Sequence, residues 1–240
     1  MLLFYIRHGD PIYSPDSLTP LGHEQAKALA KRLLLCGIER VYTSPSTRAR
    51  MTAQPFCDLT RKDMTVCDWA DEGLAGRDFF LHTDEGHGWC FQIPSMVQRF
   101  NAPVIRNLGD RWYEHPDFKG FHFAEGVRRV NEAVDSFLLS LGLRHDRENA
   151  RYEVVADLPD APERVALFAH QGFGMLFFSS ILDIPYPFFC THFDFGHSSM
   201  TVVNFERQGD YVYAKVLQLS NDSHLYREGL LTGYQNLIQF

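Results

Sequence analysis

Two apolar runs, far apart in the chain, each end in a short polar turn that contains a histidine. Residues 2–6 are followed by Arg7-His8-Gly9, and residues 165–169 are followed by His170-Gln171-Gly172. Short apolar runs of this kind are typical of strands that are buried on both faces. If both strands belong to one parallel sheet, their carboxyl ends lie at the same edge, where open α/β sheets bind ligands. The pattern predicts that Arg7 and both histidines face one crevice.

Helix signals alternate with these strands. Thr19 before Pro20 is typical of a helix start, and Gly37 is placed to end that helix. Residues 38–43 predict a second strand, and Ser44-Pro45 predicts that another helix opens directly after it.

Later segments continue the alternation. An apolar stripe predicts a helix over residues 127–141, and residues 201–205 and 211–219 are typical of a hairpin that closes the sheet. We therefore expect one α/β domain over residues 1–240, a three-layer α/β/α sandwich with a mainly parallel central sheet. Residues 73–125 have no clean period but many aromatic residues, which indicates a packed insertion that forms a lid over the active edge.

The overall charge constrains the partners. The chain has 23 basic and 30 acidic side chains and a net charge of -7, which argues against nucleic acid or an anionic membrane as the main partner. The first apolar run is too short for a signal peptide or a membrane span, and the five scattered cysteines are typical of reduced thiols. These features predict a cytoplasmic protein whose oligomeric state the sequence does not define.

The candidate functional residues are basic. Arg7, His8, Arg48 and His170 each lie before a loop or at a helix start, so they can surround one small anion. Arginine matches the oxygens of phosphate, and the backbone amides at the start of a helix at Gln171 would favour the same charge. A neutral histidine among them can attack phosphorus. A small phosphorylated metabolite is therefore the expected substrate.

Four segments together resemble the histidine phosphatase superfamily of phosphoglycerate mutase-like proteins. In chain order they are Arg7-His8-Gly9, residues 18–22 (LTPLG), residues 43–53 (TSPSTRARMTA) and Ala169-His170-Gln171-Gly172. The resemblance implies a phosphoglycerate mutase-like fold and a phosphoric monoester hydrolase of the histidine acid phosphatase type. It also implies that no metal or other cofactor is needed.

The resemblance further implies a role for each matched residue. His8 would be the nucleophile that forms a phosphohistidine, and Arg7, Arg48 and His170 would clamp the phosphoryl group, with Gln171 as a further substrate contact. A carboxylic acid from the middle of the chain would protonate the leaving oxygen. Arg50 lies two residues beyond Arg48 and stays open as an alternative ligand.

The acid has three candidates. Glu72 fits the spacing of the family best, whereas Asp68 and Asp71 are alternatives. Three carboxylates within five residues would repel one another, so the one that faces the pocket could hold a proton near neutral pH.

Other polar groups have weaker patterns. His82, Asp84, Glu85 and His87 match no known zinc spacing and are expected in a polar loop. His192 and His197 flank a loop that should approach the pocket, where packing is the favoured role and substrate contact the alternative. No G-x-S-x-G elbow occurs in the chain, which disfavours a serine hydrolase built on Ser198 or Ser199.

Three functions stay open on these grounds. The favoured one is a metal-independent phosphatase of a small phosphomonoester. The second is a phosphoglycerate mutase, which needs a sealed site with more basic residues than the few dispersed ones in residues 73–125. The third is a non-catalytic phosphate-binding module on the same scaffold.

Overall fold

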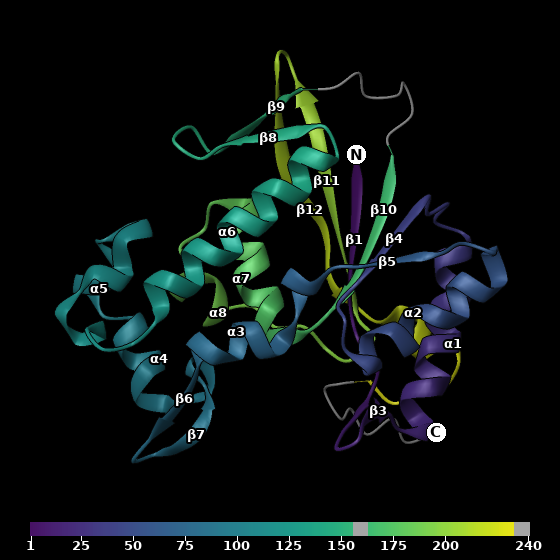
Figure 1. Cartoon of the computed structure of the whole chain (residues 1–240), viewed down its shortest axis with the longest axis horizontal. Helices are drawn as coiled ribbons and strands as arrows, with labels where there is room; N and C mark the ends of the chain where they lie inside the picture. The colour runs from purple at the N-terminus through teal and green to yellow at the C-terminus, as the bar shows by residue number, and fades with distance from the viewer. Residues whose placement is uncertain (156–162, 233–240) are drawn as a thin grey trace.

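A mixed central sheet with helices on both faces organises the chain (Figure 1). The computed structural model describes residues 1–155 and 163–232. Within these residues the main sheet has the strand order β5 (Met64–Val66), β4 (Arg40–Thr43), β10 (Arg164–Ala169), β1 (Leu2–Arg7), β11 (Met200–Gln208), β12 (Tyr211–Asn221), β9 (Arg151–Val154) and β8 (Leu143–Asp146). The pairs from β5 to β1 are parallel, and those from β1 to β8 are antiparallel. The expected α/β class is confirmed, and its parallel half carries both motif strands.

Each face of β1 packs against its own pair of helices. Leu3 and Tyr5 share a buried cluster with residues of α6 (Phe123–Ser140) and α7 (Gln171–Leu182). Phe4 and Ile6 share the other cluster with residues of α1 (Pro20–Leu34) and α2 (Thr47–Thr60). Successive strand residues point to opposite faces, so covering both faces makes the whole strand apolar. The expected three layers follow from this pattern.

Several local predictions are confirmed. Thr19 caps α1, because its hydroxyl oxygen accepts a hydrogen bond from the backbone N–H of Gly22 at 3.0 Å. The helix expected over residues 127–141 is α6, which begins four residues earlier, at Phe123. The expected hairpin is the antiparallel pair of β11 and β12.

The predicted start of α2 was wrong. The helix begins at Thr47, not directly after Ser44-Pro45. The backbone N–H of Ser44 still pairs with the carbonyl of Phe168 at 2.8 Å, so Ser44 extends β4. The carboxylate of Asp16 accepts the N–H of Thr47 at 2.6 Å at the start of α2. A distant side chain thus satisfies the helix end, which no local sequence signal reveals.

The segment of residues 73–125 is built from short elements. These are most of α3 (Glu72–Phe79), β6 (Phe80–Thr83), β7 (Gly86–Trp89), α4 (Pro94–Phe100), α5 (Pro103–Arg106) and the 3-10 turns Cys90–Gln92, Gly109–Glu114 and Pro116–Phe118. Phe79, Phe100, Trp112 and Phe118 are buried together with Tyr186 of α8 (Tyr186–Cys190). The aromatic residues of this segment are therefore packed, as their number indicates, and the role of the segment as a lid stays a prediction.

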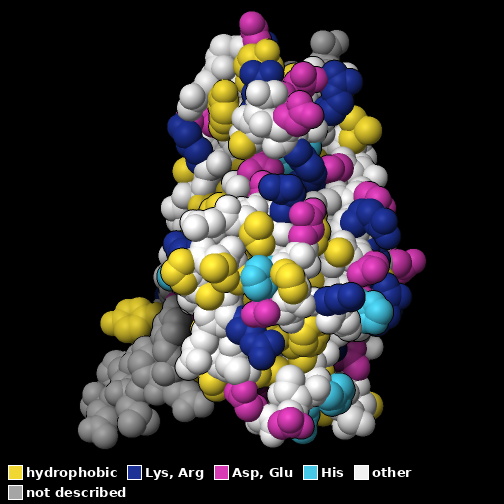
Figure 2. Space-filling model, turned by 90° about the vertical axis from the view of Figure 1, so that its left-hand side faces the viewer, with side chains coloured by type: hydrophobic (Ala, Val, Ile, Leu, Met, Phe, Trp, Pro, Cys, Tyr) yellow, Lys and Arg dark blue, Asp and Glu magenta, His cyan; other side chains and the backbone are white. Residues whose placement is uncertain are grey.

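The remaining elements are short. They are β2 (Pro11–Tyr13), β3 (Asp16–Leu18), the 3-10 turn Asp68–Ala70 and α9 (Ser223–Arg227). None of the helices in residues 1–155 and 163–232 combines the length and the apolar composition that crossing a membrane requires. On the face that carries α5 and the turn between β8 and β9, basic and acidic side chains are interleaved (Figure 2).

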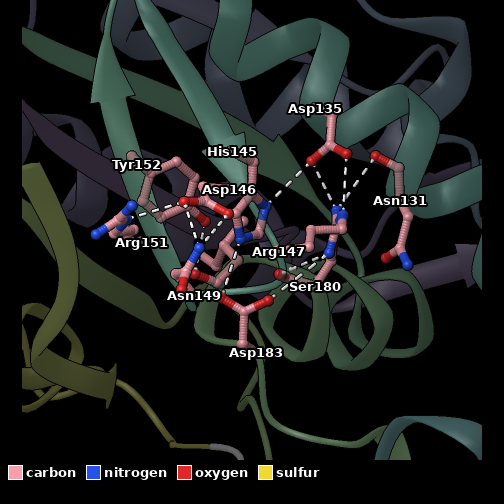
Figure 3. Close-up of polar contacts among 11 residues, drawn as sticks. Asn131, Asp135, His145, Asp146, Arg147, Asn149, Arg151, Tyr152, Ser180 and Asp183 are labelled. Carbon is pink, nitrogen blue, oxygen red and sulfur yellow. Dashed lines mark hydrogen bonds and ion pairs between the residues drawn. The ribbon is translucent and has the colours of Figure 1, made fainter.

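A buried histidine joins β8, the edge strand of the main sheet, to α6 and to the end of α7 (Figure 3). The His145 ring contacts Asp135 through Nδ1 at 3.1 Å and Asp183 through Nε2 at 2.9 Å, and it stacks on Tyr152. Arg147 donates to the same Asp135 carboxylate. Burial opposes a charge on His145, but the hydrogen bonds of both carboxylates outweigh it and raise its pKa. The protonated ring therefore holds these elements together.

We expect His145→Gln to destabilise the protein most at acidic pH. A histidine whose pKa is raised in the folded state contributes stability below its unfolded pKa of about 6.5, and this contribution is lost as the pH rises through the folded value. The expected loss in the free energy of unfolding is about 2 kcal/mol at acidic pH and shrinks at alkaline pH. Urea unfolding across the pH range measures it. The exposed His82, replaced by glutamine, is the control, and a loss independent of pH would contradict the prediction.

Candidate active site

The register of the parallel strands brings the two motif histidines together. Arg7 of β1 pairs with Ala169 of β10, so the next residues, His8 and His170, lie side by side at the carboxyl edge. Their ring centroids are 5.3 Å apart, and both side chains are buried. The expected convergence of the two motifs at one edge is what the structure shows.

His8 presents one free ring nitrogen. Its Nδ1 lies 2.7 Å from the carbonyl oxygen of Gly9, and because a carbonyl only accepts, Nδ1 carries the hydrogen. Burial first, and then the charge of Arg7, lower the pKa of His8 well below its usual value. The ring is thus neutral and its Nε2 has a lone pair, the state in which imidazole is a nucleophile.

His170 has both ring nitrogens engaged. Arg48 Nη2 lies 3.2 Å from His170 Nδ1, and since a guanidinium only donates, Nδ1 is the acceptor. Nε2 lies 2.7 Å from the hydroxyl oxygen of Ser44. Burial, followed by the charges of His8 and Arg48, lowers the pKa of His170 well below its usual value. The ring is therefore neutral, and its Nε2–H donates to Ser44.

Both motif arginines keep a buried N–H group without a partner. Arg7 donates through Nη1 to the carbonyl of Phe195 and through Nη2 to His197. Arg48 donates through Nη1 to Asp16 at 2.8 Å and through Nη2 to His170. The Nε atom of each arginine is buried and has no hydrogen-bond partner among residues 1–155 and 163–232. Buried donors without partners are rare in proteins, so each of these two atoms is a candidate donor to a bound anion.

Glu72 is the carboxylate that reaches this site. Its two oxygens accept the backbone N–H groups of Gly172 at 3.0 Å and Phe173 at 2.9 Å, at the start of α7. A helix start favours negative charge. Burial nevertheless raises the pKa of Glu72, although these two hydrogen bonds and the positive charges of Arg48 and Arg7 act to lower it.

The other two candidate acids have different positions. Asp71 caps α3, since its carboxylate accepts the N–H groups of Gly73 and Leu74, and Asp68 is exposed to solvent. Burial is the largest cause of the raised pKa of Glu72, whereas the sequence argument relied on repulsion among neighbouring carboxylates.

The loop before β11 supplies a residue that the sequence did not single out as a ligand. His197 Nε2 lies 2.8 Å from Arg7 Nη2, and its ring centroid is 5.6 Å from that of His8. His192 of the same loop is exposed and contacts Thr191 and Phe188. Packing was the favoured role for both histidines, but only His197 contacts the site.

Two further candidate residues can be placed. Gln171 directs its side-chain amide to Asp194, and Arg50 is exposed on α2 whereas Arg48 is largely buried. A cavity of about 340 Å³ lies beside Arg48 and Glu72. It is lined by Asp16, Pro45, Ser46, Thr47, Arg48, Asp71, Glu72 and Gly73.

The residues considered for a metal lie on the β6–β7 hairpin. His82 and His87 are paired across its two strands, with ring centroids 6.0 Å apart, and Glu85 accepts the N–H of Ser95. Within residues 1–155 and 163–232, no three His, Cys, Asp or Glu side chains are grouped so as to hold a metal ion.

Known proteins share this fold. The chain has a TM-score of 0.58 to phosphoserine phosphatase of Entamoeba histolytica, with 18% identity over 93% of this chain and 98% of that one. For mycobacterial glucosyl-3-phosphoglycerate phosphatase the TM-score is 0.57, with 22% identity over 92% and 98%.

Two sequence comparisons each match part of the chain. A protein of Hydrogenobacter thermophilus named "Putative phosphoserine phosphatase 2" is 27% identical over 152 residues, which are 60% of this chain and 68% of that protein. The family model of the histidine phosphatase superfamily (branch 1) matches residues 3–88, which include Arg7-His8-Gly9, Arg48 and Glu72. Over residues 3–88 the chain is therefore similar to the histidine phosphatase superfamily, and over most of its length it shares its fold with the two phosphatases named above.

Proposed function

We propose that the protein is a metal-independent phosphatase that hydrolyses a small phosphomonoester through a phosphohistidine on His8. The observation that carries this proposal is the neutral His8 ring, whose Nε2 is free beside two arginines with unpartnered buried N–H groups. Such a site supplies a nucleophile and anion donors together. The acceleration would come mainly from positioning and charge stabilisation.

In the first step, His8 Nε2 forms a bond to phosphorus while the bond from phosphorus to the leaving oxygen breaks. Arg7 and Arg48 donate to the phosphoryl oxygens through the N–H groups that now lack partners. His170 supports this step by holding Arg48, since its Nδ1 accepts from Arg48 Nη2. An incoming dianion that raises the pKa of His170 enough to protonate Nδ1 would make this nitrogen a further donor, and Arg48 Nη2 would then donate to the phosphoryl group in place of His170.

Glu72 serves as the acid and then as the base. Burial raises its pKa, and a phosphoryl dianion nearby would raise it further, so the carboxyl can hold a proton for the leaving oxygen. In the second step the carboxylate removes a proton from water, and the resulting hydroxide attacks phosphorus. The bond to His8 Nε2 breaks, and inorganic phosphate leaves.

The wall of the cavity favours hydrolysis over mutase chemistry. Among the described residues that line the cavity, Arg48 is the one cationic side chain, and it is paired with Asp16. A mutase must hold the carboxylate of a three-carbon acid in addition to its phosphate, and these lining residues add no second cation for it. We therefore infer a small phosphorylated metabolite as substrate. We also propose a cytoplasmic location, which the five free cysteines support.

The test is phosphate release from an activated aryl phosphate, with and without excess chelator. We expect turnover that the chelator does not reduce, and a phosphoryl group on the protein that is lost in acid and retained in alkali, as expected for phosphohistidine. Turnover that needs an added metal ion would refute the metal-independent mechanism. Absence of turnover together with tight phosphate binding would favour the non-catalytic binding module.

A further inference from the structure

His197 is hydrogen-bonded to Arg7. It lies in the loop between α8 and β11, together with Phe195, whose carbonyl accepts from Arg7 Nη1. His197 Nε2 accepts from Arg7 Nη2 at 2.8 Å. The loop therefore holds both terminal nitrogens of this guanidinium and leaves its buried Nε unpartnered.

The His197 ring is itself held in one orientation. Because Arg7 can only donate, Nε2 of His197 is the acceptor, and the ring hydrogen belongs on Nδ1. Nδ1 faces the carboxylate of Asp10 at 3.5 Å. Asp10 in turn accepts the hydroxyl of Thr19 at 2.6 Å, at the start of α1. Burial first, and then the charge of Arg7, lower the pKa of His197 to about 4, which keeps the ring neutral.

This arrangement indicates that His197 acts on the anion through Arg7 and does not bind the anion itself. A neutral ring that accepts from Arg7 through Nε2 and directs Nδ1–H toward Asp10 has no N–H left for a phosphoryl oxygen. The ring can act on the anion only through Arg7. Since a guanidinium binds oxyanions through a rigid fork of N–H groups, its orientation decides how many of them reach the anion.

We propose that His197 is a positioning residue that aims the guanidinium of Arg7 at the phosphoryl group, with Asp10 fixing its ring. The inference rests on the anion site of the proposed function and not on attack by His8. It predicts that an acceptor at the place of Nε2 is needed for tight anion binding, whether that acceptor belongs to a ring or to an amide.

The test compares His197→Ala with His197→Gln. The amide oxygen of glutamine can reach the place of Nε2 and accept from Arg7, whereas alanine offers no acceptor. His192→Ala is the matched control, because His192 lies in the same loop and is exposed. For each variant we would measure the dissociation constant of inorganic phosphate by calorimetry, kcat and KM for an aryl phosphate, and the thermal midpoint.

We expect His197→Ala to weaken phosphate binding by about tenfold, as for the loss of a hydrogen bond to a charged group, and to lower kcat/KM at least as much. His197→Gln should recover most of both losses, and His192→Ala should match the wild type. Equal defects in the alanine and glutamine variants, or unchanged phosphate binding in His197→Ala, would overturn the inference.

Failure of the proposed function has a different signature. If the wild type binds phosphate but hydrolyses nothing, the proposed chemistry fails, while the dissociation constants of the variants still decide the role of His197. If the wild type binds no phosphate at all, Arg7 is not an anion ligand and the inference is overturned as well.

Discussion

Replacement of His8 by alanine is expected to abolish turnover, with kcat reduced by about 10⁴-fold or more, as for the loss of a nucleophile in other covalent mechanisms. No neighbouring ring can replace it. His170 has both nitrogens engaged with Arg48 and Ser44, and Nε2 of His197 accepts from Arg7. Steady-state release of phosphate from an activated aryl phosphate measures the effect, because this substrate does not need protonation of its leaving group.

A second substitution, His8→Asn, separates the loss of the nucleophile from the loss of side-chain packing. His8 is 2% exposed, so alanine leaves a cavity, whereas His8→Asn keeps a side-chain N–H for the Gly9 carbonyl. Both variants should lose turnover and the acid-labile phosphoryl group, and both should still bind inorganic phosphate through the arginines. Retention of more than about 1% of kcat in folded His8→Asn would exclude His8 as the nucleophile. The exposed His192, replaced by alanine, is the control.

The strand ends of this site could be predicted because they follow from topology alone. Two buried apolar runs in one parallel sheet must end at the same edge, and the pairing of Arg7 with Ala169 then puts His8 beside His170. The same reasoning applies to Ser44, which follows β4 and lies next to His170. Because Ser44 precedes Pro45, the local pattern predicts a helix cap there. That prediction was preferred to a position of Ser44 at the carboxyl edge of the sheet.

Residues that reach the site from outside the parallel strands were harder to predict. Asp16 belongs to the β2–β3 hairpin, and no spacing rule links that hairpin to the start of α2. His197 had a usable signal. Met200 of β11 pairs antiparallel with Ile6, so residues just before β11 must lie at the carboxyl edge of β1. The sequence predicts the hairpin of β11 and β12, but not that β11 would be the strand beside β1.

For Glu72, the sequence predicts where the side chain lies but not why its pKa is raised. Family spacing favoured it over Asp68 and Asp71, and the structure puts it alone of the three at the start of α7. Its raised pKa depends on burial, which composition does not reveal. Repulsion among nearby carboxylates is an argument from the sequence, whereas burial is the largest cause of the raised pKa in the folded protein.

Replacement of Glu72 by alanine is expected to have an effect that depends on the leaving group. For an alkyl phosphate, whose leaving oxygen needs a proton, kcat/KM should fall by about 10²- to 10⁴-fold, the usual contribution of a general acid. For an activated aryl phosphate the first step needs no acid and should proceed. The second step still needs a base to deprotonate water, so the phosphoenzyme should accumulate.

Stopped-flow measurement distinguishes these steps. In the Glu72→Ala variant we expect a burst of about one equivalent of aryl alcohol per site, followed by slow turnover, since covalent intermediates that form faster than they decay give bursts. The controls are Asp68→Asn, at an exposed position, and Asp71→Asn, because asparagine caps helices as well as aspartate does. Both controls should stay near the wild type on both substrates. A uniform loss on both substrates in Glu72→Ala, without a burst, would show that Glu72 acts by holding the start of α7, whose N–H groups it now binds, and that the proton comes from another group.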